Sequence, residues 1–274
     1  MSRIIAIANQ KGGVGKTTTN VNLSACLAQA GRKVLVADMD PQGNSTSGLG
    51  LNKNSLPLTI YNLLMGEAYI EQVMQPTAVS GMKMLPANID LAGAELELID
   101  REQREYILKN ILLHSKYLYD YILIDCPPSL NLLTLNALCA ADTVLMPIQC
   151  EYFALEGMSQ LLKTIELVQR KLNPRLKIEG ILFTMFDSRT NLSTQVVDEV
   201  KQHMGEYVFQ TMIPRNVRLS EAPSHGLPIT LYDEKSKGAE SYMALAAEII
   251  DRDGKDYAEE SAGPRSWRAA GRKQ

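Results

Sequence analysis

Two lysines fall within one glycine-rich stretch near the start of the chain, residues 9–18, with the sequence N-Q-K-G-G-V-G-K-T-T. A turn of this kind between a strand and a helix points successive backbone N–H groups, and the positive end of the helix dipole, at one place. That arrangement suits a polyphosphate. At this spacing Lys16 reaches the β- and γ-phosphates, and the Thr17 hydroxyl ligates Mg²⁺. The second lysine, Lys11, is not needed for this chemistry and requires a separate explanation.

Carboxylates at the ends of two later apolar runs predict the rest of a phosphate-handling site. Asp125 closes the run Y-I-L-I-D, and Asp38 and Asp40 follow the run V-L-V-A. Open α/β sheets bind ligands beside the carboxyl ends of their strands, so we expect these acids to meet the glycine-rich loop. Asp125 is expected to hold a water on Mg²⁺ next to Thr17. Because residues two apart on an extended chain point to opposite sides, Asp38 and Asp40 are expected to differ in role.

Short apolar runs alternate with helical periodicity along most of the chain, which predicts an α/β fold: a doubly wound, mostly parallel sheet with helices on both faces. Residues 1–252 are expected to form one domain. From 253 to 274 the composition changes to Gly, Ser, Glu, Lys and Arg, which predicts a disordered tail with a basic end. Strands are expected at 4–8, 33–38, 82–85, 121–125, 143–148, 178–184 and 208–213, and helices at 17–30, 101–117, 131–140, 155–172, 192–204 and 239–251.

Composition agrees with an intracellular globular protein of 274 residues, with a formal net charge of −3. The first residues lead directly into the first expected strand without a signal peptide, and no apolar run approaches transmembrane length. A cytoplasmic location is therefore expected. The cysteines have no C-x-x-C spacing and lie in apolar contexts, so we expect reduced core thiols at Cys26, Cys126, Cys139 and Cys150.

The loop departs from the usual phosphate-binding pattern G-x-x-x-x-G-K-[ST], because Gln10 stands at its first position. The variant K-G-G-V-G-K-T resembles the deviant Walker A loop of the ParA/MinD ATPases, which have the P-loop NTPase fold. Four further segments narrow the resemblance to the chromosomal ParA (Soj) type and extend it over nearly the whole expected domain. They are D-P-Q-G-N, I-D-C-P-P-S, Q-C-E-Y-F-A-L-E-G and P-R-N-V-R-L-S-E-A-P-S-H-G.

The resemblance implies a role for the second lysine. In that family the lysine matched by Lys11 crosses a dimer interface to the nucleotide held by the other subunit. Gly12 then lies where two backbones approach closely, so that a side chain there blocks the dimer. ATP and Mg²⁺ are the implied cofactors, and the implied phosphate contacts are Lys11, Gly12, Gly13, Val14, Gly15, Lys16, Thr17 and Thr18.

The resemblance also assigns the acids. It implies that Asp40 orients the attacking water, so that Lys11, Lys16 and Asp40 are the catalytic residues. Asp38 supports the Mg²⁺ hydration shell, and the implied metal residues are Thr17, Asp38 and Asp125.

The residues expected near the base favour ATP over GTP. Many related GTPases end a late strand with [NT]-K-x-D, whose aspartate selects guanine. Here Met185 replaces the lysine although Asp187 remains, so the guanine signature is broken. The segment I-P-R-N resembles the family loop that packs on adenine. Met185, Pro214 and Asn216 are therefore the expected base contacts.

The implied function is chromosome partitioning by an ATP-driven homodimer that binds double-stranded DNA without sequence preference. The segments D-S-R-T-N and N-V-R-L-S-E-A-P-S-H-G make Arg189 and Arg218 the candidate DNA contacts. A net acidic chain is unusual for a DNA binder, but phosphate contacts on a local patch add across the two subunits of a dimer. The family implies a ParB-type partner that stimulates hydrolysis, an association with the nucleoid and no membrane. A role for a replication initiator as a further partner is left open.

Three other functions are compatible with a loop of this kind. A MinD-type membrane-cycling ATPase needs a C-terminal amphipathic helix, whereas residues 253–274 offer only Tyr257, Trp267 and scattered alanines, interrupted by Gly263 and Pro264. An iron–sulfur protein needs suitably exposed cysteines, whereas the cysteines of this chain have no C-x-x-C spacing and lie in apolar contexts. The third alternative is a DNA-binding regulator that does not depend on hydrolysis. The presence of Lys16, Thr17, Asp40 and Asp125 argues against it.

Overall fold

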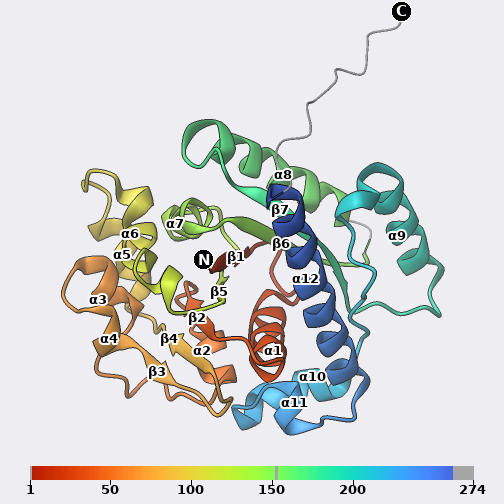
Figure 1. Ribbon diagram of the computed structural model, residues 1–274, viewed down its shortest axis with the longest axis horizontal. Coiled ribbons are helices and arrows are strands. Elements are labelled where there is room, and N and C mark those ends of the chain that lie inside the picture. The colour runs from red at the N-terminus through yellow and green to blue at the C-terminus, as the bar shows by residue number, and fades with distance from the viewer. Residues whose placement is uncertain (1, 152–153, 262–274) are drawn as a thin grey trace, which may run out of the picture.

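The computed structural model describes residues 2–151 and 154–261, and a seven-stranded sheet lies at its centre (Figure 1). The strand order is β3-β4-β2-β5-β1-β6-β7, and every neighbouring pair is parallel except β3 with β4. Because β1 lies between β5 and β6, the loop that follows it opens at the middle of the carboxyl edge. The strands are β1 (Arg3–Ile7), β2 (Val34–Asp38), β3 (Gln75–Pro76), β4 (Met82–Leu85), β5 (Tyr121–Asp125), β6 (Thr143–Gln149) and β7 (Lys177–Thr184).

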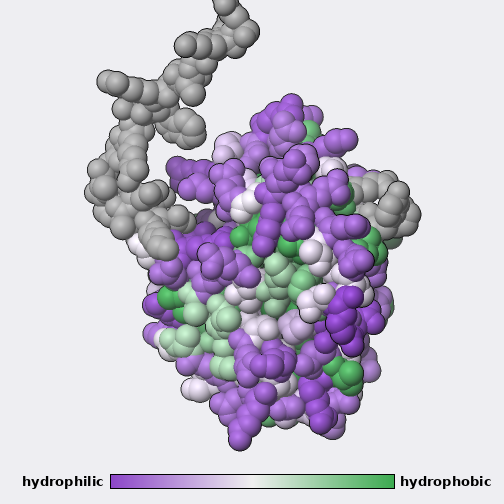
Figure 2. All heavy atoms as spheres, turned by 90° about the vertical axis from the view of Figure 1, so that its right-hand side faces the viewer, coloured by the Kyte–Doolittle hydropathy of each residue, from purple (hydrophilic) through white to green (hydrophobic). Residues whose placement is uncertain are grey.

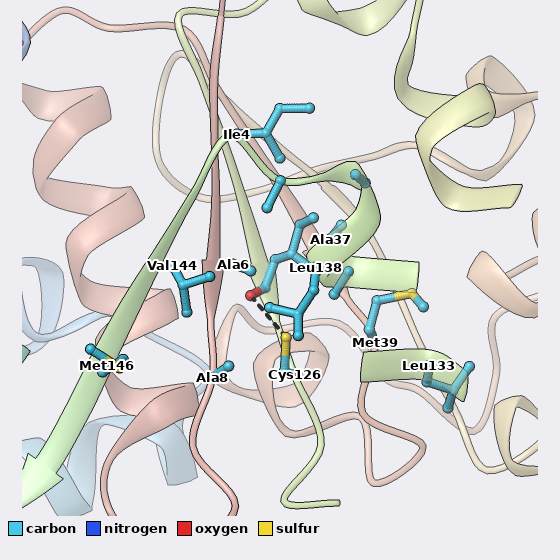
Figure 3. Packing of buried hydrophobic residues seen from close by; sticks show 14 of the residues in the cluster. Ile4, Ala6, Ala8, Ala37, Met39, Cys126, Leu133, Leu138, Val144 and Met146 are labelled. Atoms are coloured by element: carbon cyan, nitrogen blue, oxygen red, sulfur yellow. Dashed lines mark hydrogen bonds between the residues drawn. The ribbon is translucent and has the colours of Figure 1, made fainter. Parts of the chain in front are cut away.

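The central strands are buried on both faces, as the apolar runs predicted. Along β1, Ile4 and Ala6 belong to one hydrophobic cluster, whereas Ile5 and Ile7 belong to the cluster on the opposite face. Figure 3 shows the packing of the first cluster, where Leu138 of a covering helix lies near the strand residues. The predicted α/β architecture, with a mostly parallel sheet and helices on both faces, is confirmed.

Helices cover both faces of the sheet (Figure 1). The first cluster is closed mainly by α3 (Ile60–Met65), α5 (Leu91–Glu97), α6 (Ile107–Leu112), α7 (Leu132–Ala140), α8 (Ala154–Lys171) and α9 (Asn191–Met204). The second is closed by α1 (Lys16–Gln29), α10 (Val217–Glu221), α11 (Ile229–Tyr232) and α12 (Lys237–Ser261). Two short helices, α2 (Asn44–Gly48) and α4 (Ile70–Val73), lie in the connections. Seen from the side of α9, hydrophilic side chains surround a central apolar area (Figure 2).

Three predicted elements differ from the structure. The expected strand at 208–213 is wrong: Val208, Phe209 and Ile213 are buried, but the segment meets its neighbours only at isolated bridges, such as Ile181 with Val208. The expected helix at 101–117 is broken, because Gln103 has a φ of 53° and two 3-10 turns flank α6. The last helix extends to Ser261, past the expected start of the tail, and residues 262–274 lie outside the described part of the chain.

Gly180 provides a test of the packing between β7 and the segment that follows α9. A Cβ at Gly180 would lie 2.5 Å from Cε2 of Phe209 and 2.8 Å from the carbonyl oxygen of Tyr207. We expect Gly180→Ala to lower the free energy of unfolding by roughly 1–3 kcal/mol, because two crowded groups must move. Gly205→Ala is the control, since a Cβ there meets nothing within 4 Å. Urea unfolding compares the two, and equal losses would contradict the packing argument.

Candidate functional site

The glycine-rich loop closes on the N-terminus of α1 at the centre of the carboxyl edge. Gly13 (φ 74°) and Gly15 (φ 88°) have left-handed backbone conformations that larger residues disfavour. Thr184, at the end of β7, donates a 2.8 Å hydrogen bond from Oγ1 to the carbonyl oxygen of Val14. The glycines thus permit the loop conformation, and the hydrogen bond from Thr184 at the end of β7 holds it in place. The first backbone N–H groups of α1 are left available to an anion.

Lys16 lies inside this loop and is only 7% exposed. Its Nζ donates a 3.1 Å hydrogen bond to the carbonyl oxygen of Lys11. Burial lowers the pKa of Lys16, and the charges of Asp125 and Asp40 partly oppose that effect. A buried ammonium group beside a neutral carbonyl gains substantially from an anionic ligand, as the predicted phosphate contact requires.

Lys11 faces the surface of the same loop and forms an ion pair with Glu151. Its Nζ lies 2.6 Å from Oε2 of Glu151, and the side chains are 37% and 46% exposed. The other Glu151 oxygen accepts a hydrogen bond from Nε2 of Gln149. The backbone N–H of Lys11 donates to Oδ1 of Asn9 at 3.0 Å. Lys11 is therefore held within its own subunit by a carboxylate from the end of β6.

Asp125 is fully buried at the end of β5, and only one of its oxygens is paired. Oδ2 accepts a 2.7 Å hydrogen bond from Oγ of Ser45, whereas Oδ1 has no partner among the residues that the structure describes. Burial, and next the neighbouring Asp38 carboxylate, raise the pKa of Asp125 to about 8. The Ser45 and Thr17 hydroxyls favour its ionised form to a lesser extent. A bare carboxylate oxygen here is poised for a cation.

Asp38 and Asp40 differ in surroundings, as expected from their spacing. Asp38 is level with Asp125 on the adjacent strand, and its Oδ2 accepts hydrogen bonds from the backbone and hydroxyl of Thr46, at 2.9 and 2.8 Å. Its Oδ1 accepts from the N–H of Asp40 at 3.2 Å. These bonds make Asp38 the anchor of the loop between β2 and α2, and its expected role near Mg²⁺ stays a prediction. Asp40 accepts from the N–H of Gln42 at 2.9 Å.

The residues around Asp125 fit a magnesium ion that also binds phosphate. Within the described ranges, no group of three or more His, Cys, Asp or Glu side chains is placed to hold a metal. Mg²⁺ commonly takes one or two protein ligands and completes its shell with water and substrate phosphates. The unpaired Asp125 oxygen and the Thr17 hydroxyl provide such a partial set. The cysteines are free and buried, as predicted, which leaves no exposed thiol for a cluster: Cys26, Cys126, Cys139 and Cys150.

A pocket of about 610 Å³ begins at the loop and extends toward α10. It brings together five of the residues predicted from the sequence to contact the nucleotide: Gly15, Thr18, Met185, Pro214 and Asn216. Met185 has a φ of 50°, and the Asn216 side chain caps α10 by accepting hydrogen bonds from the backbone N–H groups of Arg218 and Leu219. This pocket has the location and the mixed apolar and polar lining that an adenosine group requires.

The candidate DNA contacts lie at the surface, outside the lining of this pocket. The side chains of Arg189 and Arg218 are 86% and 54% exposed. Asp187 forms an ion pair with Arg189, which holds the pKa of Asp187 at about 2. Asp187, the residue that would select guanine, is thus engaged by a neighbouring arginine.

Sequence patterns did not identify three of the residues that position the site. Ser45 and Thr46 lie directly after D-P-Q-G-N and hold the two buried aspartates, but short hydroxyl residues after a turn carry no distinctive signal. Glu151 lies in the segment Q-C-E-Y-F-A-L-E-G, whose residue types indicate no particular chemistry. Its pairing with Lys11 joins residues 140 positions apart, which only the folded chain reveals.

Comparisons with known proteins agree with this geometry. A family model described as an AAA domain matches residues 2–178. The chain is 58% identical over 249 residues to the sporulation initiation inhibitor protein Soj of Bacillus subtilis (strain 168), which covers 91% of this chain and 98% of that protein. It is 57% identical over 253 residues to the chromosome partitioning protein ParA of Myxococcus xanthus (strain DK1622), with coverage of 92% and 89%.

Among solved structures, the chain is similar to cobyrinic acid a,c-diamide synthase from Mycobacterium smegmatis with bound ADP and magnesium. The TM-score is 0.83 at 42% identity, with 93% of this chain and 97% of that chain covered. None of the described helices combines the length and the apolar character needed to cross a bilayer.

The half-paired state of Asp125 predicts a pH effect on stability. Its folded pKa lies above its ordinary value, so the folded chain binds more protons than the unfolded chain between about pH 4 and pH 8, and stability falls as the pH rises. From pH 6 to pH 8 we expect a loss of about 2 kcal/mol without nucleotide. Asp125→Asn removes most of this loss and raises stability at pH 8. Urea unfolding followed by circular dichroism measures both.

Asp198→Asn, on the exposed face of α9, is the matched control and should leave the pH dependence unchanged. A wild-type chain equally stable at the two pH values would contradict the burial argument. So would an Asp125→Asn variant with the same loss.

Proposed function

This chain belongs to the AAA-domain family of ParA and Soj proteins, and on that basis we propose that it is an ATPase that partitions chromosomes. ATP with Mg²⁺ joins two copies into a dimer that binds DNA without sequence preference. A ParB-type partner stimulates hydrolysis and releases the dimer from the nucleoid. The observation that carries the ATPase proposal is the unpaired, buried Asp125 oxygen next to the phosphate-binding loop.

The nucleotide lies across the loop and the adjoining pocket. The phosphates meet the N–H groups at the start of α1 and the Lys16 ammonium, while the adenine enters the pocket lined by Met185, Pro214 and Asn216. Asp125 and Thr17 would hold Mg²⁺, which would neutralise phosphate charge when bound. This placement is supported by the relative of known structure, which holds ADP and magnesium. ATP is favoured over GTP because Asp187 is paired with an arginine.

Hydrolysis needs a water positioned for attack on the γ-phosphate, and we assign this role to Asp40. Asp40 follows β2 at the same edge of the sheet as the loop, and its side chain is 8% exposed. One of its oxygens already accepts the Gln42 N–H, which limits the rotation of the carboxylate. A carboxylate fixed in this way orients a water at little entropic cost.

Dimerisation is assigned to Lys11 and Gly12. A Cβ at Gly12 would meet nothing within 4 Å in its own subunit, so internal packing does not require glycine there. The open space at Gly12 leaves room for the close approach of a second backbone, as in the proposed dimer. Lys11 then exchanges Glu151 for the phosphates of the partner's nucleotide, which bring more negative charge than one carboxylate.

DNA binding is assigned to a surface that includes Arg189 and Arg218. The net charge of −3 does not favour nucleic acid, so the proposal depends on local contacts. Two subunits double these contacts, and the release of counterions makes affinity rise steeply with their number. A single subunit is expected to bind DNA weakly and the dimer strongly.

Replacing Asp40 tests the hydrolytic assignment. We expect Asp40→Ala to retain ATP binding and to lose at least about 100-fold in hydrolysis rate, because the water is no longer oriented. Asp100→Ala, at an exposed acid, is the control and should hydrolyse ATP normally. Phosphate release and equilibrium binding of labelled ATP are measured separately. Undiminished turnover in Asp40→Ala would remove Asp40 from the mechanism.

Replacing Lys11 tests the proposed dependence of dimerisation and DNA binding on ATP. With ATP, wild-type protein should elute as a dimer and bind duplex DNA in a salt-dependent manner, whereas with ADP or no nucleotide it should do neither. In Lys11→Ala both properties should be lost together, because the link to the partner's nucleotide is missing. Lys83→Ala, at an exposed lysine of β4, is the control. A dimer that forms without Lys11, or DNA binding that ignores nucleotide and salt, contradicts the proposal.

A further inference from the structure

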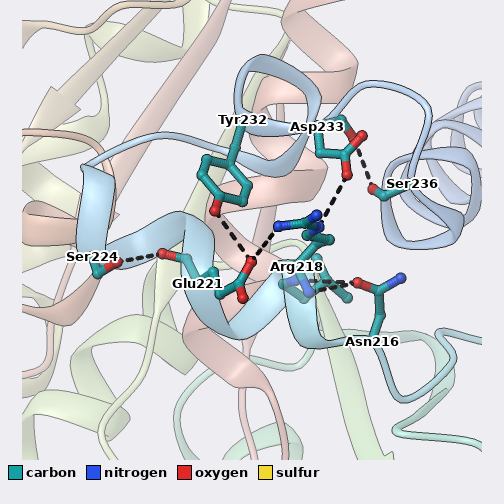
Figure 4. A network of polar contacts seen from close by, with 8 residues as sticks. Asn216, Arg218, Glu221, Ser224, Tyr232, Asp233 and Ser236 are labelled. Carbon is teal, nitrogen blue, oxygen red and sulfur yellow. Dashed lines mark hydrogen bonds and ion pairs between the residues drawn. The ribbon is translucent and has the colours of Figure 1, made fainter.

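Arg218 is held by two carboxylates of its own subunit (Figure 4). Its Nη1 lies 2.9 Å from Oε2 of Glu221, and its Nε lies 3.4 Å from Oδ2 of Asp233. The hydroxyl of Tyr232 donates a 3.1 Å hydrogen bond to the same Glu221 oxygen. The ring of Tyr232 stacks on His225 with 4.9 Å between centroids. The acids are thus placed around the guanidinium by α10, α11 and the turns that connect them.

Arg189 has an equivalent arrangement in a separate segment. Its Nε and Nη2 meet the two oxygens of Asp187 at 2.8 and 2.6 Å, and its backbone N–H donates to Oδ1 at 3.0 Å. This bidentate ion pair uses the edge of the guanidinium that would otherwise bind two phosphate oxygens. Both candidate DNA arginines are therefore occupied by acids near them in the chain.

We propose that Asp187, Glu221 and Asp233 compete with DNA phosphates for Arg189 and Arg218 and thereby set the affinity of the DNA surface. The inference rests on the proposed DNA binding and adds acidic residues that oppose it. To meet a phosphate, each arginine must leave its carboxylate, and the vacated carboxylate then repels the DNA backbone. Exposed ion pairs are weak, so each acid is expected to lower the affinity only about two- to fivefold.

Competition by the acids affects a single subunit and the dimer differently. A single subunit meets DNA with few contacts, and a several-fold penalty at each arginine keeps its binding negligible. Two subunits bring twice as many contacts, whose effects on affinity multiply, so the dimer overcomes the same penalties. The penalties multiply as well, so the acids lower the affinity of the dimer by a larger factor than that of the single subunit, while they keep the binding of the single subunit negligible.

The test uses the full-length chain with single neutral replacements: Asp187→Asn, Glu221→Gln and Asp233→Asn. Glu166→Gln is the matched control, because Glu166 also pairs with an exposed arginine, Arg170, but on α8, and its loss changes the net charge equally. Binding to a labelled duplex of random sequence is measured by fluorescence anisotropy, with and without ATP, over a range of salt concentrations.

With ATP, each of the three acid variants should bind DNA more tightly than the control variant, by at least about two- to fivefold, because the dimer contains the replaced acid twice. Tyr232→Phe should shift affinity in the same direction by a smaller factor, since Glu221 loses the donor that fixes it. Circular dichroism establishes that each variant is folded. Acid variants that match the control, or that bind more weakly than wild type, overturn the inference.

Arg189→Ala and Arg218→Ala separate this inference from the proposed function. If wild type binds DNA and the arginine variants lose affinity while the acid variants gain none, DNA binding stands and the competition is wrong. If the arginine variants bind as wild type does, the surface has been assigned to the wrong residues and the competition falls with it. If wild type binds no DNA in any nucleotide state, both proposals are wrong.

Discussion

The carboxyl edge of the sheet is organised around two aspartates buried side by side. Asp38 and Asp125 occupy the same level on β2 and β5, and burial raises the pKa of both. Asp38 is compensated by Thr46 and by the Asp40 N–H, whereas Asp125 keeps one oxygen unpaired. A buried acid without a partner is costly, and a bound cation removes that cost. The loop, α1 and the β2–α2 connection therefore frame a site that is completed only by its ligand.

The same edge links the nucleotide to the segment that carries Arg218. The connection that contains Asp40 runs through α2 to Gly50, which lies against Gly226 at the end of the turn after α10. A Cβ at Gly226 would lie 2.6 Å from Cα of Gly50, so the two backbones are in direct contact. Asn216 belongs both to the wall of the nucleotide pocket and to the N-terminus of α10. Segments that hold nucleotide and candidate DNA contacts thus share one packed unit.

Local signals predicted the fold, and five of the residues expected at the nucleotide line one pocket, because strand, loop and helix are encoded by adjacent residues. The prediction was wrong where burial does not imply regular structure: Val208 and Ile213 are apolar because they pack at the edge of the sheet, and no continuous ladder forms there. The ion pairs could not be predicted from the sequence for a different reason. Lys11 with Glu151 depends on the meeting of distant segments, and Arg218 with Asp233 depends on a turn. Neither pair has a spacing that marks it.

The present partners of the four cations proposed to bind phosphate imply an order of events. Lys16 is buried and donates to a neutral carbonyl, so a phosphate reaches it without breaking an ion pair. Lys11, Arg189 and Arg218 are exposed to a greater extent, and each already has a carboxylate. A phosphate gains the full interaction at Lys16 but only a difference of interactions at the other three. In the proposed cycle, a nucleotide therefore binds one subunit first. The proposed exchange at Lys11 and at the two arginines then becomes favourable only where a second subunit adds contacts.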